Sequence, residues 1–361
     1  MLLNGLAILA VVLNHASGWG YTAMVYWADR YRPVTVPNFD QVWSPGFYGL
    51  VIINQLALFS VPAFLFVAGF FIAYTSRADA RGLSWKVVRA RITKLLIPYL
   101  IWSVFIFVEE ALQGKSLSPT EYLSALITGG ATGAYFFVPV LFQFYLLSPL
   151  IIRLAQGHAR ALLIAAAVIQ LFPMSIFYLK FFGIYLLEGI YAPSWLCIWF
   201  MFYFPLGVVV GFRLKSFQIW VERYRPTLIT LSIVFAIVSM LETMWVYQST
   251  DNLALAERPF KLSSELYAIV FILAFLSIDV TRRRVSKRLN WLGARSYGIF
   301  LSNPVLLEWT ARVIRRALPA LLSFQLILTI VLTMTSILII ALIMEGVARS
   351  RMHGAYHYLF G

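Results

Sequence analysis

Long apolar segments alternate with short polar ones along the whole chain, and this alternation predicts the fold. A helix needs about 20 largely apolar residues to cross the hydrocarbon core of a bilayer. Ten segments meet or approach that length, and we expect each to form a transmembrane helix. They lie near residues 2–19, 48–75, 92–112, 135–153, 160–179, 195–213, 227–247, 263–280, 290–311 and 323–347.

Two stretches between these spans carry a weaker pattern. Residues 120–134 are polar and lead into the Gly-rich run TGGATGAYF, and residues 181–194 read FFGIYLLEGIYAPS. We expect residues 120–134 to form a re-entrant or interfacial segment and residues 181–194 to lie at the membrane interface. Because no internal repeat is apparent, the prediction is one all-α, polytopic membrane helix bundle of about ten transmembrane helices. It covers residues 1–361 without a soluble domain.

The composition agrees with a lipid environment. Hydrophobic residues make up 61% of the chain and charged residues only 12%, whereas a soluble domain has about 25% charged residues. The 11 Trp and 19 Tyr fit aromatic belts at the two membrane interfaces. The four His and the single Cys197 show no metal-ligand spacing, so we expect no metal site and no internal disulfide.

The net charge of +14 follows the membrane topology rather than a nucleic-acid partner. Twenty of the 29 Lys and Arg fall in the even-numbered connections and at the C-terminus, which places these segments in the cytoplasm. The chain is therefore predicted to be a multi-pass plasma (inner) membrane protein with both termini cytoplasmic. Residues 76–94 and 281–295 are the most basic connections, and fixing the topology is a sufficient role for most of their charges. The first segment lacks a basic n-region and a cleavage site, so we expect it to be retained as a span.

Polar side chains at membrane depth are functional candidates because their burial in lipid is costly. His15 leads them, about 20 Å into the first predicted helix at 1.5 Å per residue. Asn4 lies eleven positions earlier, which is close to three helical turns, so both residues are expected on nearly the same helix face. An interfacial histidine bonded to a neighbour is the alternative for His15. Six further polar residues are expected at interfaces (Glu242, Glu265, Glu308) or in interhelical hydrogen bonds (Asn54, Gln55, Gln143).

Several stretches, in order along the chain, resemble the acyltransferase-3 family of membrane acyltransferases. They are LLNGLAILAVVLNHA, FSVPAFLFVAGFFIA, RARITKLLIPYLIWS, YFFVPVLFQFYLLSPLI and LNWLGARSYGIFLSNPVLLEW. The family moves acyl groups, often acetyl, onto sugars and other hydroxyl acceptors of the cell envelope. This chain departs from the family pattern at three positions: it has Asn4 where the family has Arg, Ala68 where Ser is usual, and Asn303 where His is usual.

The resemblance implies a mechanism in which His15 is the general base that deprotonates the acceptor hydroxyl, or alternatively carries the acyl group itself. Asn4 and Asn303 are then expected to orient the base or to donate to the oxyanion. The co-substrate is expected to be acyl-CoA, most simply acetyl-CoA, with a glycan or small hydroxylated molecule as acceptor. The phosphates of coenzyme A are expected to contact the basic cluster before the third span, specifically Arg77, Lys86, Arg89 and Arg91.

Other functions remain open at this point. The same cationic cluster suits anionic lipid headgroups as well as it suits coenzyme A. A transporter or flippase of an envelope lipid or glycan is a second hypothesis, although no Asp lies in the middle of a predicted span. A catalytically silent scaffold is a third, and the substitutions at Asn4 and Asn303 are its main support.

Overall fold

The structure, a computed structural model, describes residues 1–27, 42–77, 83–184, 192–278 and 284–361. These residues form α-helices joined by turns and three short 3₁₀ segments, and they include no strand. The helices are α1 (Leu2–Val25), α2 (Pro45–Ala57), α3 (Ser60–Ser76), α4 (Trp85–Leu112), α5 (Pro119–Thr128), α6 (Phe137–Gly157), α7 (Ala159–Phe181), α8 (Tyr203–Phe212), α9 (Leu214–Arg223), α10 (Arg225–Thr250), α11 (Leu253–Ala256), α12 (Leu262–Leu276), α13 (Arg284–Ala294), α14 (Ser296–Ala317), α15 (Gln325–Arg349) and α16 (Tyr356–Phe360).

The predicted helical membrane bundle is confirmed. Within the described ranges, seven segments are long and apolar enough to cross a membrane: α1, α2 together with α3, α4, α6, α7, α10 and α15. The other three predicted spans correspond to α8 and α12, which are shorter apolar helices, and to α14. The 22 residues of α14 carry several charges in the last three turns. The number of about ten spans therefore stays a prediction.

The second predicted span is interrupted where α2 ends and α3 begins. Pro62 lies in the first turn of α3. Proline has no N–H, and its ring clashes with the carbonyl four residues earlier, here that of Leu58. The continuous helix therefore stops at Ala57, and residues on both sides of the break line a cavity. Irregular backbone at membrane depth is tolerated where it faces such a cavity rather than lipid.

Close helix crossings depend on small residues. A Cβ added to Gly69 on α3 would lie 2.1 Å from the carbonyl oxygen of Phe204 on α8. In the reverse direction, a Cβ on Gly207 would lie 2.0 Å from the carbonyl oxygen of Phe66. Because lipid provides no hydrophobic drive between helices, backbone contact of this kind supplies much of the packing energy.

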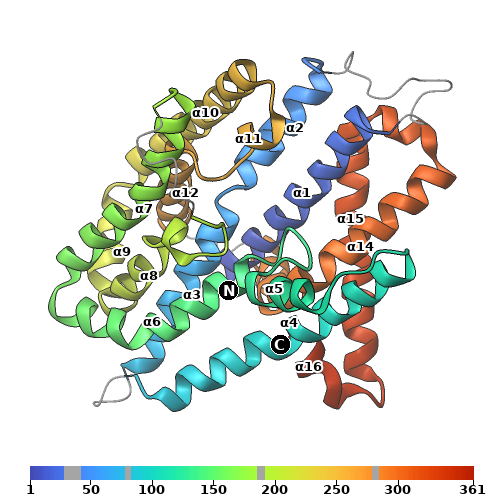
Figure 1. Cartoon of the computed structure of the whole chain (residues 1–361). Helices are drawn as coiled ribbons and strands as arrows, with labels where there is room; N and C mark the ends of the chain where they lie inside the picture. The colour runs from blue at the N-terminus through green and yellow to red at the C-terminus, as the bar shows by residue number, and fades with distance from the viewer. Residues whose placement is uncertain (28–41, 78–82, 185–191, 279–283) are drawn as a thin grey trace.

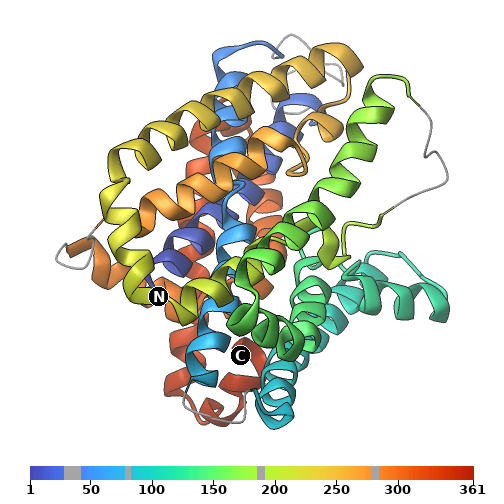
Figure 2. The same ribbon diagram turned by 90° about the vertical axis from the view of Figure 1, so that its left-hand side faces the viewer.

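The position of the chain termini distinguishes the two ends of the bundle. Figure 1 shows α1, α14 and α15 on one side of the molecule and α7, α10 and α12 on the other. Both chain termini lie toward the same end, in the lower half of Figure 2. We name this the terminal end, and here Gly361 lies close to the carbonyl oxygen of Lys94. At the opposite end, the loop end, the ring of Trp43 before α2 lies 5.3 Å from that of Tyr247 on α10.

Polar side chains form hydrogen bonds inside the bundle, and of the three predicted interhelical bonds the structure shows the one of Gln55 between α2 and α10. Gln55 on α2 accepts a hydrogen bond from Ser239 on α10 at 2.8 Å, and its amide donates to Asn54 at 2.8 Å. Gln143 on α6 donates to the carbonyl of Trp195 at 2.7 Å. These bonds satisfy polar groups that lipid cannot satisfy.

Candidate active site

A cavity surrounds the side chain of His15. Its volume is about 590 Å³, within the range of small-molecule sites. Helices α1 and α14, the α2–α3 break, the turn after α5 and the start of α12 all contribute to its walls. We name it the His15 chamber; its polar lining includes His15, Asn54, Thr132, Glu257, Glu265 and Glu308.

His15 and Asn303 are brought together across two helices. The Nδ2 atom of Asn303 and the Nδ1 atom of His15 lie 2.8 Å apart in a hydrogen bond. Asn303 is fully buried, and its Oδ1 atom has no partner. Turning the amide over by 180° exchanges Nδ2 and Oδ1, so this contact fits both tautomers of the ring. When Oδ1 accepts from Nδ1–H, the Nε2 lone pair is free to take a proton.

Three carboxylates line the same chamber, and two of them are bonded to neighbours. Glu265 on α12 accepts from Gln170 at 2.8 Å and from the hydroxyl of Tyr203. Glu308 on α14 forms an ion pair with Arg312, one turn further along the helix. Glu265 therefore joins α12 to α7 and α8, whereas the ion pair of Glu308 lies within α14.

Glu257 differs from the other two carboxylates. It follows α11 in the connection to α12, and its buried Oε1 atom has no hydrogen-bond partner. Burial raises the pKa of Glu257 to about 7, although nearby Tyr21 and Lys261 act in the opposite direction. The ammonium of Lys261 donates instead to the carbonyls of Ala256 at 2.5 Å and Arg258 at 3.0 Å.

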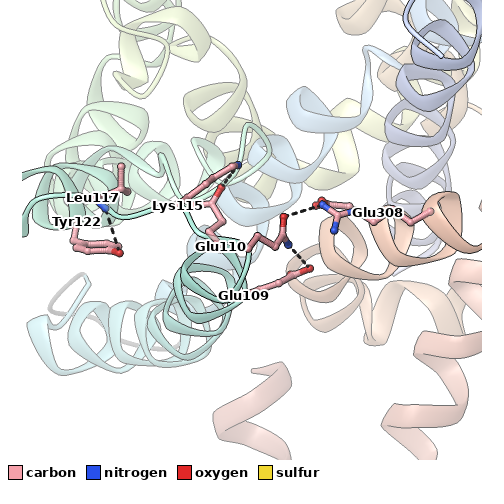
Figure 3. Close-up of polar contacts among 8 residues, drawn as sticks. Glu109, Glu110, Lys115, Leu117, Tyr122 and Glu308 are labelled. Carbon is pink, nitrogen blue, oxygen red and sulfur yellow. Dashed lines mark hydrogen bonds and ion pairs between the residues drawn. The ribbon is translucent and has the colours of Figure 1, made fainter. Parts of the chain in front are cut away.

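A smaller polar chamber of about 170 Å³ adjoins the His15 chamber and shares Thr132, Pro304 and Glu308 with it. Figure 3 shows Glu109 and Glu110 at the end of α4, facing Glu308. Glu109 accepts from the indole of Trp309 at 2.5 Å, and Glu110 pairs with Lys115 at 2.9 Å.

A second chamber of about 300 Å³ opens near the terminal end and is basic. Arg91 and Lys94 from the first turns of α4 line it, together with Asn4 of α1. Arg91 also donates to the hydroxyl of Thr75 at 3.5 Å, and its guanidinium lies 6.0 Å from the ring centre of Tyr145. We name this cavity the Arg91 chamber.

The other predicted cofactor-binding cations are not part of the described lining of this chamber. Arg77, Lys86 and Arg89 are exposed on the surface near the terminal end. Arg81, which belongs to the same basic connection, lies outside the described residues. Of the four predicted cations, Arg91 lines this chamber, next to Lys94.

The two chambers share one aromatic side chain in their linings. Phe300 on α14 lines both, and its ring centre lies 5.5 Å from that of Phe137. Asn4 and His15 lie on the same helix but in different chambers, about 16 Å apart at 1.5 Å per residue. Asn4 therefore does not join His15 and Asn303 in one site.

Comparison with known proteins places the chain in a family. Residues 2–345 match the family described as "Acyltransferase domain", which is nearly the whole chain. The chain belongs to the acyltransferase-3 family. Membership accounts for a membrane-embedded acyltransferase in general, while the donor, the acceptor and the catalytic residues need separate arguments.

Curated relatives of this family member are found in Staphylococcus aureus. The proteins from strains MSSA476 and N315 are each named "Probable poly-beta-1,6-N-acetyl-D-glucosamine export protein". Each is 20% identical over 262 residues, which is 71% of this chain and 71% of the relative. The protein from strain MRSA252 carries the same name and is 19% identical. No solved structure matches the chain at a significant level.

The sequence did not indicate Glu257 or Phe300 as site residues. Glu257 follows a short helix in a polar connection, where a carboxylate is ordinarily solvated. Phe300 is one of 29 Phe residues and carries no local signal. Glu265 was predicted at an interface, whereas it is buried between α7, α8 and α12.

Proposed function

We propose that the chain is a membrane acyltransferase that moves an acyl group, most simply acetyl, from cytoplasmic acyl-CoA to a hydroxyl of a glycan or other envelope acceptor. One observation carries the proposal: His15, hydrogen-bonded to Asn303, lines one chamber, and Phe300 lines both this chamber and a second, basic one. The family supports acyl transfer in general.

The Arg91 chamber suits the donor. Coenzyme A carries several phosphate charges, and the guanidinium of Arg91 with the ammonium of Lys94 offers matching cations. The amide of Asn4 adds a neutral hydrogen-bonding group in the position where the family pattern has Arg. Binding here directs the thioester toward Phe300 and the His15 chamber.

The His15 chamber suits the acceptor. With Nδ1–H donating to Asn303, the free Nε2 atom of His15 takes the proton from the acceptor hydroxyl. The hydroxyl oxygen attacks the thioester carbonyl, the C–S bond breaks, and the proton passes to the departing thiolate, so the products are the ester and free coenzyme A. The polarity of the sequence, with Lys and Arg concentrated at the terminal end, supports a cytoplasmic donor side.

Export of a glycan is the second candidate, because the Staphylococcus aureus relatives are named as export proteins. Two chambers that share a lining residue, Phe300, are also compatible with a transport path. Export predicts glycan movement that does not depend on acyl-CoA, whereas acyl transfer predicts release of free coenzyme A.

The test is an assay of the purified protein in detergent with radiolabelled acetyl-CoA. Wild type should release coenzyme A and transfer or hydrolyse the acetyl group, and His15→Ala should lower the rate of this release about 100- to 10,000-fold, to a residual rate that can still be measured. Binding of acetyl-CoA by the variant, measured by equilibrium dialysis, should be retained because His15 lies outside the Arg91 chamber. Turnover by His15→Ala at the wild-type rate would remove His15 from the mechanism, and the absence of acetyl-CoA binding in wild type would favour export.

A further inference from the structure

The His15 chamber has an unbalanced charge. Three carboxylates, those of Glu257, Glu265 and Glu308, line it, and within the described part of the chain no Lys or Arg does. The adjoining smaller chamber adds Glu109 and Glu110. A neutral sugar does not require such a lining, since amides and backbone groups also form hydrogen bonds with hydroxyl groups.

Glu257 is the carboxylate left available for a ligand. Glu308 is neutralised by Arg312, and Glu265 already accepts two hydrogen bonds through one oxygen. The Oε1 atom of Glu257 is buried and makes no hydrogen bond, although the Tyr21 hydroxyl and the Lys261 ammonium lie near enough to favour the charged form of Glu257. The Lys261 ammonium itself donates hydrogen bonds to two backbone carbonyls. A buried polar atom without a hydrogen bond costs about 1–3 kcal/mol of stability. Such an atom is therefore expected where a ligand supplies the missing hydrogen bond.

An ammonium group is the chemical group that completes this site. It supplies donors to the unpartnered oxygen and a charge that balances the carboxylate. The aromatic rings of Trp19, Phe136 and Phe200 line the same chamber, and aromatic faces attract both sugar rings and cations. The volume of about 590 Å³ accommodates a sugar-sized ligand.

We propose that the acceptor is an amino sugar whose nitrogen is not acylated, and that Glu257 binds its ammonium group while a hydroxyl faces His15. The proposal rests on the acyltransferase function and names the acceptor's chemical class. A protonated nitrogen has no free lone pair and is not a nucleophile, so the acyl group is transferred to oxygen. Glu257 is thereby a specificity residue, because it selects the charged acceptor over its neutral N-acetyl form.

Two probes with the same ring hydroxyls isolate the charge: methyl glucosaminide and methyl N-acetylglucosaminide. Their binding to wild-type protein is measured by isothermal titration at pH 7, without acetyl-CoA, so this arm does not depend on turnover. Wild type should bind the glucosaminide about tenfold or more tightly, which is the scale of one charge-assisted hydrogen bond. Glu257→Gln should reduce this preference to less than about threefold, and Glu257→Asp should restore part of it.

Two controls keep the result interpretable. Glu345→Gln removes the same charge from the exposed side chain that pairs with Arg349 near the terminal end, and its preference should equal that of wild type. Acetyl-CoA binding by Glu257→Gln should be unchanged, which shows that the variant is folded.

Equal or tighter binding of the N-acetyl form by wild type would overturn the proposal, as would an unchanged preference in folded Glu257→Gln. Failure of acyl transfer with a retained glucosaminide preference would instead count against the proposed function alone.

Discussion

Replacing Asn303 by leucine removes the hydrogen bond to His15 and keeps a side chain of similar volume in a fully buried position. The bond between Nδ2 and Nδ1 is 2.8 Å long. Loss of one partner of a buried hydrogen bond costs about 1–3 kcal/mol. At about 1.4 kcal/mol for each factor of ten in rate, kcat should fall about 5- to 150-fold. The KM for acetyl-CoA should stay the same, because the lining of the Arg91 chamber does not include Asn303.

The assay is a double-mutant cycle on coenzyme A release with His15→Ala, Asn303→Leu and the double variant. If Asn303 acts through His15, leucine has no further effect once the imidazole is gone. Asn303→Asp is the conservative variant, because a carboxylate oxygen accepts from Nδ1–H and leaves Nε2 as the base. It should retain more activity than leucine.

Full activity of Asn303→Leu would refute the role of the pair. The same fold-loss in the presence and absence of His15 would show that Asn303 acts independently of the imidazole. An aspartate variant no better than the leucine variant would contradict the assigned tautomer.

Three further predictions follow from the chambers and their packing. Arg91→Glu should raise the KM for acetyl-CoA about tenfold, because a charge-assisted contact to phosphate is lost. Arg89→Glu is the matched control and should leave KM near the wild-type value. Equal effects of both variants would indicate a general surface role in lipid binding or topology. Phe300→Ala should connect the chambers, so that acetyl-CoA is hydrolysed without acceptor at a higher rate than in wild type, and an unchanged hydrolysis rate would show that this ring does not separate them. Gly207→Ala places a Cβ 2.0 Å from a backbone oxygen and should lower the melting temperature by several degrees in a thermal-shift assay. Gly346→Ala, where open space surrounds the Cβ, should leave the melting temperature unchanged. Equal melting temperatures of the two variants would contradict the close crossing of α3 and α8.

Hydropathy was sufficient to predict the class of fold because the bilayer requires apolar segments of a definite length. It was insufficient for details that depend on neighbouring helices. The span predicted at 48–75 is two helices, since Pro62 interrupts it at a cavity wall. Helix α14 is less apolar than the other long helices because its last turns carry charges. Among them, Arg312 bonds to Gln113, just after α4, and to Glu308 of α14 itself.

The candidate site was likewise predictable from the sequence only in part. His15 was identifiable because an imidazole at membrane depth is rare, and its partner Asn303 came from the family resemblance. The placement of Asn4 in the other chamber was not predictable, since the same helix face passes both chambers. Arg89 and Arg91 were equivalent in the sequence. On a helix, however, side chains two residues apart point in directions that differ by about 200° around the axis, and only Arg91 lines the chamber. Glu257 reaches the chamber through a connection that has no sequence periodicity.

The central claim is that an acyl group passes from a donor bound at the terminal end to an acceptor in the His15 chamber. Proteoliposomes test this most directly, with radiolabelled acetyl-CoA supplied only on the side of the terminal end and methyl glucosaminide enclosed on the other side. The account predicts label on the enclosed acceptor with wild-type protein and far less with His15→Ala. Label that stays on the donor side, or equal transfer by the His15 variant, would contradict it.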